Sequence, residues 1–217
     1  MKKIYITTPI FYVNDLPHIG HAYTQIICDA ISRFFKNKKF EVLFTTGTDE
    51  HGLKVEKAAK KNGKKPQEFV DEVSQNFKNL GKKLEITNTD FIRTTESRHK
   101  ISAICFWKNL YENDEIYLSK YEGWYSIKDE SFYQEKELKK INKDFFTSDG
   151  EKVDWIEEES FFFRLSKYQD KLLDFYEMHP DFIHPKTRMN EVQSFVSSGL
   201  KDLSISRTSF SWGIQIP

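Results

Sequence analysis

The hydrophobic and polar positions of the first 114 residues alternate between the period of a strand and the period of a helix. A short β-rich run, KKIYITT, ends at Pro9 and predicts a first strand. From Pro17 the apolar residues recur every three or four positions, which predicts an amphipathic helix to about Phe35, with a cap near Asn14 or Asp15. The predicted core-facing stripe of this helix is Ile19, Tyr23, Ile26, Ile27, Ala30, Ile31 and Phe34.

A second strand is predicted to run through Thr46, so strand, helix and strand fit within about 45 residues. Such a βαβ unit has parallel strands and a right-handed crossover. Helices are then predicted at 54–62 and 66–84, a third strand at TDFIRTT, and a further helix at ESRHKISAICFWKNLYEND. The alternation predicts the first half of an α/β fold with a doubly wound, Rossmann-like parallel sheet. The last of these helices has a predicted apolar stripe of Ile101, Ile104, Cys105, Trp107 and Tyr111.

Near Glu115 the pattern becomes aromatic and alternating, broken by Gly123, which predicts hairpins. Residues 160–179 then predict a helix, and a second one follows at 187–200 after Pro180 and Pro185. This part predicts a smaller α+β module inserted after the βα half. The expected domains are 1–114, the N-terminal half of a nucleotide-binding catalytic domain, 115–204, the insert, and 205–217, a return segment toward the first domain.

The composition excludes some functions. Lys and Arg number 33, as do Asp and Glu, so no overall field attracts nucleic acid or membranes. No apolar run approaches the ~20 residues of a membrane helix, and the N-terminus lacks the pattern of a signal peptide. Cys28 and Cys105 lie in apolar helical patterns and are predicted to be buried free thiols. These features predict a cytoplasmic protein without a membrane partner.

His18 and His21 follow the first predicted strand, with Gly20 between them. In a doubly wound sheet, ligands bind where the carboxyl ends of the strands meet helix N-termini. A helix N-terminus attracts phosphate, and imidazoles there can stabilise charge that grows during displacement at phosphorus. Gly20 leaves room for a flat ring to approach closely. The motif therefore predicts a nucleotide site, against the alternative of two structural histidines.

Asp49 follows the second predicted strand, in TGTDEHG. A carboxylate at this place lies beside the loop of the first strand and can bind a cation, and a paired arginine keeps such a carboxylate ionised. The alternative readings are a turn residue for Asp49, a surface charge for Arg207 and a core aromatic for Tyr12. The role of His51 stays open.

Five ordered segments covering nearly the whole chain resemble one family. PIFYVNDLPHIGH resembles the HIGH motif of class I aminoacyl-tRNA synthetases, in surroundings like those of the methionyl-tRNA synthetase family. FTTGTDEHGLKVEKAA, YEGWYSIKDESFYQEKEL, EESFFFRLSKYQDKL and DLSISRTSFSWGIQIP resemble later blocks of the same family.

The resemblance implies a ligase that activates methionine with ATP, as its Mg²⁺ complex, to methionyl-adenylate and then transfers the aminoacyl group to the methionine tRNA. It implies that His18 and His21 hold the ATP phosphates and act in catalysis, with Gly20 under the adenosine. Ile10, Tyr12 and Asp49 would bind methionine, with Asp49 on its α-ammonium. Arg207 would pair with Asp49.

The chain departs from the family in two places. Many relatives hold a structural zinc through Cys-x-x-Cys pairs, but Ser126 and Asp129 stand at the matching positions, so no zinc or other metal site is expected. The expected supports of the zinc-less hairpin are the aromatics Tyr121, Trp124, Tyr125, Phe132 and Tyr133. The family's Lys-Met-Ser-Lys-Ser loop and anticodon domain are also missing before Pro217. The expectation is a catalytically incomplete N-terminal portion that needs the C-terminal half of the enzyme as its partner.

Two alternatives remain open at the level of the sequence. One is a nucleotidyltransferase of the same His-x-Gly-His superfamily, although such chains lack the aromatic insert and the TGTDEHG block. The other is a non-catalytic module that binds nucleotide or tRNA. Lysine runs at 36–39, 57–65 and 139–143 could contact tRNA phosphates, although such runs are commonly solvated faces.

Overall fold

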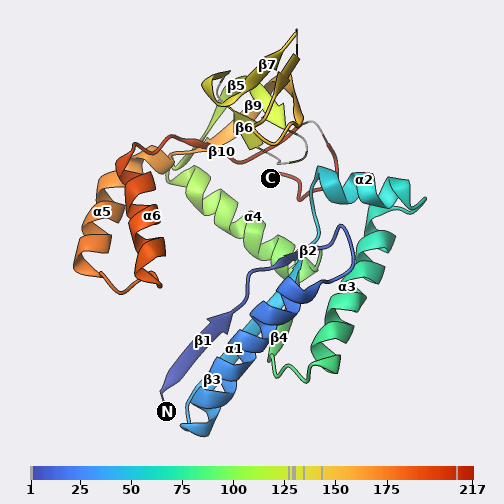
Figure 1. Cartoon of the computed structure of the whole chain (residues 1–217), viewed down its shortest axis with the longest axis vertical. Coiled ribbons are helices and arrows are strands. Elements are labelled where there is room, and N and C mark those ends of the chain that lie inside the picture. Colours follow the sequence, from blue (N-terminus) through green and yellow to red (C-terminus); the bar gives the residue numbers. More distant parts are fainter. Residues whose placement is uncertain (1, 127, 129–130, 134, 143, 209) are drawn as a thin grey trace. The chain divides into compact units, whose positions relative to one another are not determined.

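The computed structural model describes residues 2–126, 128, 131–133, 135–142, 144–208 and 210–217. It divides into two compact units, which are described separately (Figure 1). The first unit comprises residues 1–105 together with 210–217, and the second comprises residues 106–209. The functional domains expected at 1–114, 115–204 and 205–217 remain a prediction.

The first unit is built on a parallel sheet with β3 (Glu41–Asp49) at its centre. Thr45 of β3 pairs with Thr7 on one side and with Asp90 on the other, so these partners lie on opposite edges. One edge carries β1 (Lys3–Thr7) and then β2 (Phe11–Tyr12), and the other carries β4 (Asp90–Arg93). All of these pairings are parallel, which confirms the predicted βαβ topology.

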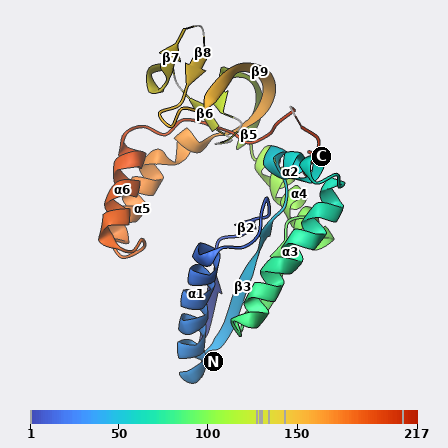
Figure 2. The ribbon, with the colours of Figure 1, turned by 45° about the vertical axis from the view of Figure 1, so that its right-hand side comes forward.

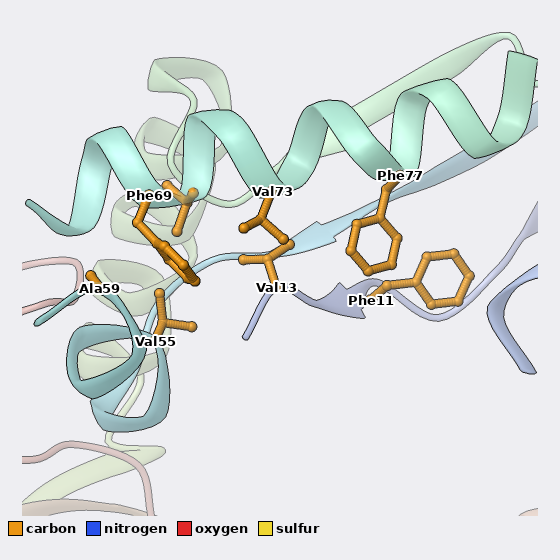
Figure 3. Close-up of a cluster of buried hydrophobic side chains, with 8 residues drawn as sticks. Phe11, Val13, Val55, Ala59, Phe69, Val73 and Phe77 are labelled. Carbon is orange, nitrogen blue, oxygen red and sulfur yellow. The ribbon is translucent and has the colours of Figure 1, made fainter. Parts of the chain in front are cut away.

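The helices of this unit are α1 (Ile19–Asn37), α2 (Leu53–Lys61), α3 (Pro66–Lys83) and the start of α4 (Ser97–Glu112). The predictions for α2 and α3 are confirmed to within one residue. Figure 3 shows the side chains from β2, from Val13 just after it, and from α2 and α3 that meet in the core of this unit. Its buried members are Phe11, Val13, Val55, Ala59, Phe69, Val70, Val73 and Phe77.

The predicted inward face of α1 is wrong. The helix runs alongside β1 and β3 (Figure 2), but it buries Gln25, Asp29 and Ser32. The apolar stripe is largely exposed, from 87% at Ile19 to 41% at Ile27. The physical reason is the loop that follows α3: Asp29 accepts hydrogen bonds from the amide (2.7 Å) and the hydroxyl (2.6 Å) of Thr87, which turns the polar face of the helix inward.

The predicted burial of both cysteines is also wrong, although both are free thiols. Cys28 is half-buried and Cys105 is exposed. Helix α4 forms as predicted, but it has no fully buried residue, and Ile101 and Tyr111 of its stripe are 67% and 55% exposed. The period of the apolar residues correctly predicted the helix, but its apolar stripe is largely uncovered in the described part of the chain.

The second unit contains a six-stranded antiparallel sheet, which confirms the predicted hairpins. Its two long strands, β5 (Ile116–Ser126) and β9 (Lys152–Phe163), pair along most of their length. The shorter strands are β6 (Ser131–Tyr133), β7 (Lys139–Ile141), β8 (Asp144–Phe146) and β10 (Leu203–Ser204). A 3₁₀ turn, Glu135–Glu137, lies between β6 and β7.

The helix predicted from residue 160 begins later than expected. Residues up to Phe163 complete β9, because Phe161, Phe162 and Phe163 pair with β5. A 3₁₀ turn (Leu165–Tyr168) then leads into α5 (Gln169–Met178). Helix α6 (Lys186–Ser197) confirms the second prediction, and Tyr176, Met189 and Val196 form the buried contact between the two helices.

Aromatic rings pack on the sheet of the second unit. The ring centroid of Trp124 lies 4.2 Å from that of Phe145 and 5.3 Å from that of Trp155. Tyr125 is buried and Tyr133 half-buried. Asp129 and the side chains of Tyr121 and Phe132, which the sequence also singled out, lie outside the described part of the chain. Among the described helices, none is both long and apolar enough to cross a membrane.

Candidate nucleotide and amino-acid site

The two histidines form the N-terminal cap of α1. His18 is the N-cap residue, so the caps expected at Asn14 or Asp15 are wrong. Nδ1 of His18 accepts a hydrogen bond from the Gly20 amide (3.1 Å), and Nδ1 of His21 accepts one from the His18 amide (3.1 Å). Because both Nδ1 atoms accept, a neutral ring carries its proton on Nε2 in each case. The two imidazoles stack with centroids 3.8 Å apart.

His21 is anchored in the apolar core. Its ring lies edge-on to Phe11 (4.9 Å between centroids) and to Phe77 (5.1 Å). This burial, together with the neighbouring His18, lowers the pKa of His21. His21 is therefore a neutral hydrogen-bond donor at pH 7, whereas His18 lies exposed beside it.

Gly20 is required by its closeness to His18. A Cβ atom at this position would lie 2.9 Å from Cε1 and 3.1 Å from Nδ1 of the His18 ring. Ordinary carbon contacts need about 3.5–4.0 Å. Any other residue would therefore force the His18 ring to move.

Asp49 ends β3 directly beside β2. It pairs with Tyr12, and its carbonyl accepts a hydrogen bond from the Val13 amide (3.3 Å). The Tyr12 hydroxyl donates to the carbonyl of His51 (3.2 Å). Since Phe11 contacts His21 and the next residue pairs with Asp49, the histidine cap and this carboxylate belong to the same end of the sheet. This arrangement agrees with the site expected at the carboxyl ends of the strands.

Glu50, between Asp49 and His51, is fully buried. Oε1 of Glu50 accepts hydrogen bonds from the Thr48 hydroxyl (2.6 Å) and from Nε of Arg93 (2.7 Å). Its Oε2 accepts from Nη2 of Arg93 (2.9 Å) and from the Thr95 hydroxyl (2.5 Å). Burial opposes the charge of Arg93, but its hydrogen bonds to Glu50 and Asp71 outweigh that effect and raise its pKa.

Trp212 holds the same loop from the other end of the sequence. Its Nε1 donates to the Glu50 carbonyl (2.6 Å), and its own carbonyl accepts from the Gly52 amide (3.1 Å). The His51 ring lies 5.4 Å from the Trp212 ring. Burial, together with Lys100 and His99, lowers the pKa of His51 to about 4.

Sequence reasoning missed Glu50, Arg93 and Trp212. The alternation of side chains along the strand could have identified Glu50. If Asp49 faces the site, Glu50 points to the opposite, buried face. A buried carboxylate there needs a cationic partner, which the structure supplies as Arg93. No local pattern identifies Trp212, which lies 162 residues from Glu50.

The other predicted residues have less defined roles. Ile10 is 43% exposed. Arg207 belongs to the second unit, where its guanidinium donates to the carbonyl of Ser206 (2.6 Å) and the hydroxyl of Ser204 (2.8 Å). The ion pair of Arg207 with Asp49 remains a prediction. In the described part of the chain, no three His, Cys, Asp or Glu side chains gather as metal ligands.

Chemically, this end of the first unit combines two complementary features. A helix N-terminus with two imidazole donors suits a phosphate chain. A carboxylate in a braced loop beside it suits an ammonium group. The arrangement therefore suits two ligands bound side by side, one with a phosphate chain and one with an ammonium group.

Comparisons with known proteins show the family of the chain. The sequence model of the family described as tRNA synthetases class I (M) matches residues 4–144 and 140–217. The chain is 56% identical over 213 residues to a methionine–tRNA ligase of Rickettsia conorii, spanning 98% of this chain and 41% of that protein. It is 48% identical over 224 residues to one of Listeria monocytogenes, spanning 100% of this chain and 34% of that protein.

Solved structures give the same result. Mycobacterium tuberculosis methionyl-tRNA synthetase in complex with methionyl-adenylate superposes with a TM-score of 0.95 and 48% identity, over 100% of this chain and 43% of that one. The free-state structure of the same enzyme superposes with a TM-score of 0.81. The chain thus spans less than half the length of these relatives. Its sequence and its Rossmann-like α/β fold show that it belongs to the class I tRNA synthetases, in the methionyl (M) family.

Proposed function

We propose that this chain carries the nucleotide and methionine site of a methionine–tRNA ligase. The observation that carries the proposal is the pairing of the His18–His21 cap with Asp49 at one end of the parallel sheet. The relative with the matching fold is described in complex with methionyl-adenylate, which supports the use of methionine and ATP.

In the first step, a carboxylate oxygen of methionine attacks the α-phosphorus of ATP, and pyrophosphate leaves as its Mg²⁺ complex. The Nε2–H groups of His18 and His21 would donate to the phosphate oxygens as charge builds on them. Gly20 would lie under the adenosine, and Asp49 would hold the α-ammonium, with Arg207 as its ion-pair partner. Ile10 and Tyr12 would line the side-chain pocket, where an aromatic ring suits a thioether.

In the second step, a hydroxyl of the 3′-terminal adenosine of the methionine tRNA attacks the carbonyl carbon, and AMP leaves. The two free thiols are typical of a reducing compartment, so we place these reactions in the cytoplasm.

The test is amino-acid-dependent exchange between ATP and pyrophosphate, with each of the twenty amino acids. The full-length protein is expected to exchange with methionine alone, whereas the 217-residue chain is expected to need the remaining polypeptide. Exchange with another amino acid would overturn the assigned substrate. Nucleotide binding without exchange by the full-length protein would favour the non-catalytic module.

We also propose that the second unit folds without zinc, since aromatic packing of Trp124 with Phe145 and Trp155 supports its sheet. Treatment with a chelator should leave its melting temperature unchanged, and elemental analysis should find no zinc. A stoichiometric zinc ion, or a chelator-induced loss of the sheet signal, would contradict this.

A further inference from the structure

We propose that Glu50 is a positioning residue that fixes the Asp49 carboxylate for the α-ammonium group of the amino acid. This inference rests on the proposed function and adds a residue to it. It starts from the direction of the side chains at the end of β3. Successive residues of a strand point to opposite faces, so Thr48 and Glu50 share one face while Asp49 points to the other. The hydrogen bond between the Thr48 hydroxyl and Glu50 agrees with this placement.

The side chain of Glu50 joins three elements. Through Arg93 it is bound to the end of β4, and Arg93 also donates to Asp71 of α3 (2.6 Å). The bond to Thr95 adds the segment between β4 and α4. Since the Glu50 side chain is 0% exposed and accepts hydrogen bonds at both carboxylate oxygens, it has little freedom to move.

The main chain of Glu50 is fixed as firmly as its side chain. Its amide donates to the Thr94 hydroxyl (2.9 Å), and its carbonyl accepts from the Trp212 indole (2.6 Å). The peptide between Asp49 and Glu50 is therefore held on both sides, because the Asp49 carbonyl accepts from Val13. A side chain whose own backbone is fixed in this way loses little further freedom when a ligand binds, which favours precise positioning.

The testable consequence is a selective effect on ligands with an α-amino group. In the full-length protein, Glu50→Gln keeps the size of the side chain but replaces one acceptor oxygen with a donor that faces Arg93 or Thr95. We expect the KM for methionine in the exchange reaction to rise about tenfold to a hundredfold. The KM for ATP and the inhibition constant of 4-(methylsulfanyl)butanoate, which lacks the amino group, should change by less than about twofold.

Two more variants separate positioning from folding. Trp212→Phe removes the indole donor to the Glu50 carbonyl while keeping an aromatic ring, although a smaller one, at this position. It should show the same selectivity with a smaller loss, so the test stands even if Glu50→Gln does not fold. Asp29→Asn is the matched control, because it disturbs another buried carboxylate of the first unit, on α1. This control should leave the ratio of the two ligand affinities unchanged.

A double variant completes the test. Asp49→Asn should show the same selective loss as Glu50→Gln, and combining the two should add little. Equal losses for methionine and for the amino-free analogue, or an unchanged ratio in folded variants, would overturn the positioning role alone. A wild-type protein that shows no methionine-dependent exchange would instead overturn the proposed function.

Discussion

At the scale of single residues, the position of the His18 ring in the cap of α1 depends on the absence of a side chain at Gly20. Gly20→Ala would place a Cβ atom 2.9 Å from the His18 ring, which must then move. Since His18 is proposed to bind the ATP phosphates, we expect the rate of pyrophosphate exchange to fall about tenfold to a hundredfold. Gly213→Ala, where the added atom meets nothing within 4 Å, is the control and should retain the wild-type rate. Equal rates for both variants would refute the coupling.

His51 gives a prediction for stability against pH. Its pKa in the folded chain is about 4, below the ordinary value of 6.5. Between these values the unfolded chain takes up a proton that the folded chain does not, so stability is complete above pH 6.5 and is lost as pH falls toward 4. After a discount for partial solvent screening, the loss is about 2 kcal/mol.

Urea unfolding of the wild type and of His51→Asn between pH 7.5 and 4.5 measures this effect. His21, whose pKa is also lowered, contributes in the same direction to both proteins. The difference between the two free energies of unfolding therefore isolates His51, and it should shrink by about 2 kcal/mol as the solution is acidified. A constant difference would show that His51 titrates normally in the folded chain.

At the scale of elements, the close approach of β3 and β4 depends on Gly47. A Cβ atom there would lie 2.1 Å from the carbonyl oxygen of Ile92, which is backbone and cannot turn aside. Gly47→Ala should therefore force the strands apart and cost about 1–3 kcal/mol, measured by urea unfolding. Gly213→Ala again serves as the neutral control. A wild-type midpoint for Gly47→Ala would contradict the tight strand contact.

The elements also show how far sequence patterns reach. The period of the apolar residues predicted the parallel βαβ unit and the helices, because backbone geometry sets that period. It failed on the inward face of α1, because a period identifies the apolar side of a helix but not what covers it. Asp29 faces inward because its hydrogen bonds with Thr87, 58 residues away, satisfy its buried carboxylate.

Only part of the candidate site could be predicted from the sequence. His18 and His21 were found because they follow a strand and open a helix, which are both local features. Glu50 and Trp212 were missed because their hydrogen bonds join residues that are distant in the sequence, such as Arg93 and the loop 49–52. Local patterns therefore located the groups proposed to touch ligands but not those that hold them in place.

At the scale of the whole molecule, each unit has its own buried cluster, which includes Phe77 in the first unit and Tyr176 in the second. We expect the units to open independently. Hydrogen exchange should show that Gly47→Ala lowers the protection of β3 amides and spares those of β5 and β9. Val153→Ala, at a buried position of β9, should do the reverse. Joint loss of protection in both units would indicate one cooperative structure.

The contact of Trp212 with Glu50 bears on the order of folding. A flexible loop of 162 residues would cost about 4.5 kcal/mol of chain entropy to close, beyond a constant. Most of that loop is the second unit. If the second unit is already folded, far fewer residues of the loop are free to move, and the entropy cost of closing it is smaller. The loop that carries Asp49 would then gain its contact with Trp212 last, after the second unit has folded. Loss of structure in the second unit would consequently delay the contact that fixes the Asp49 loop, although Trp212 and Glu50 both belong to the first unit.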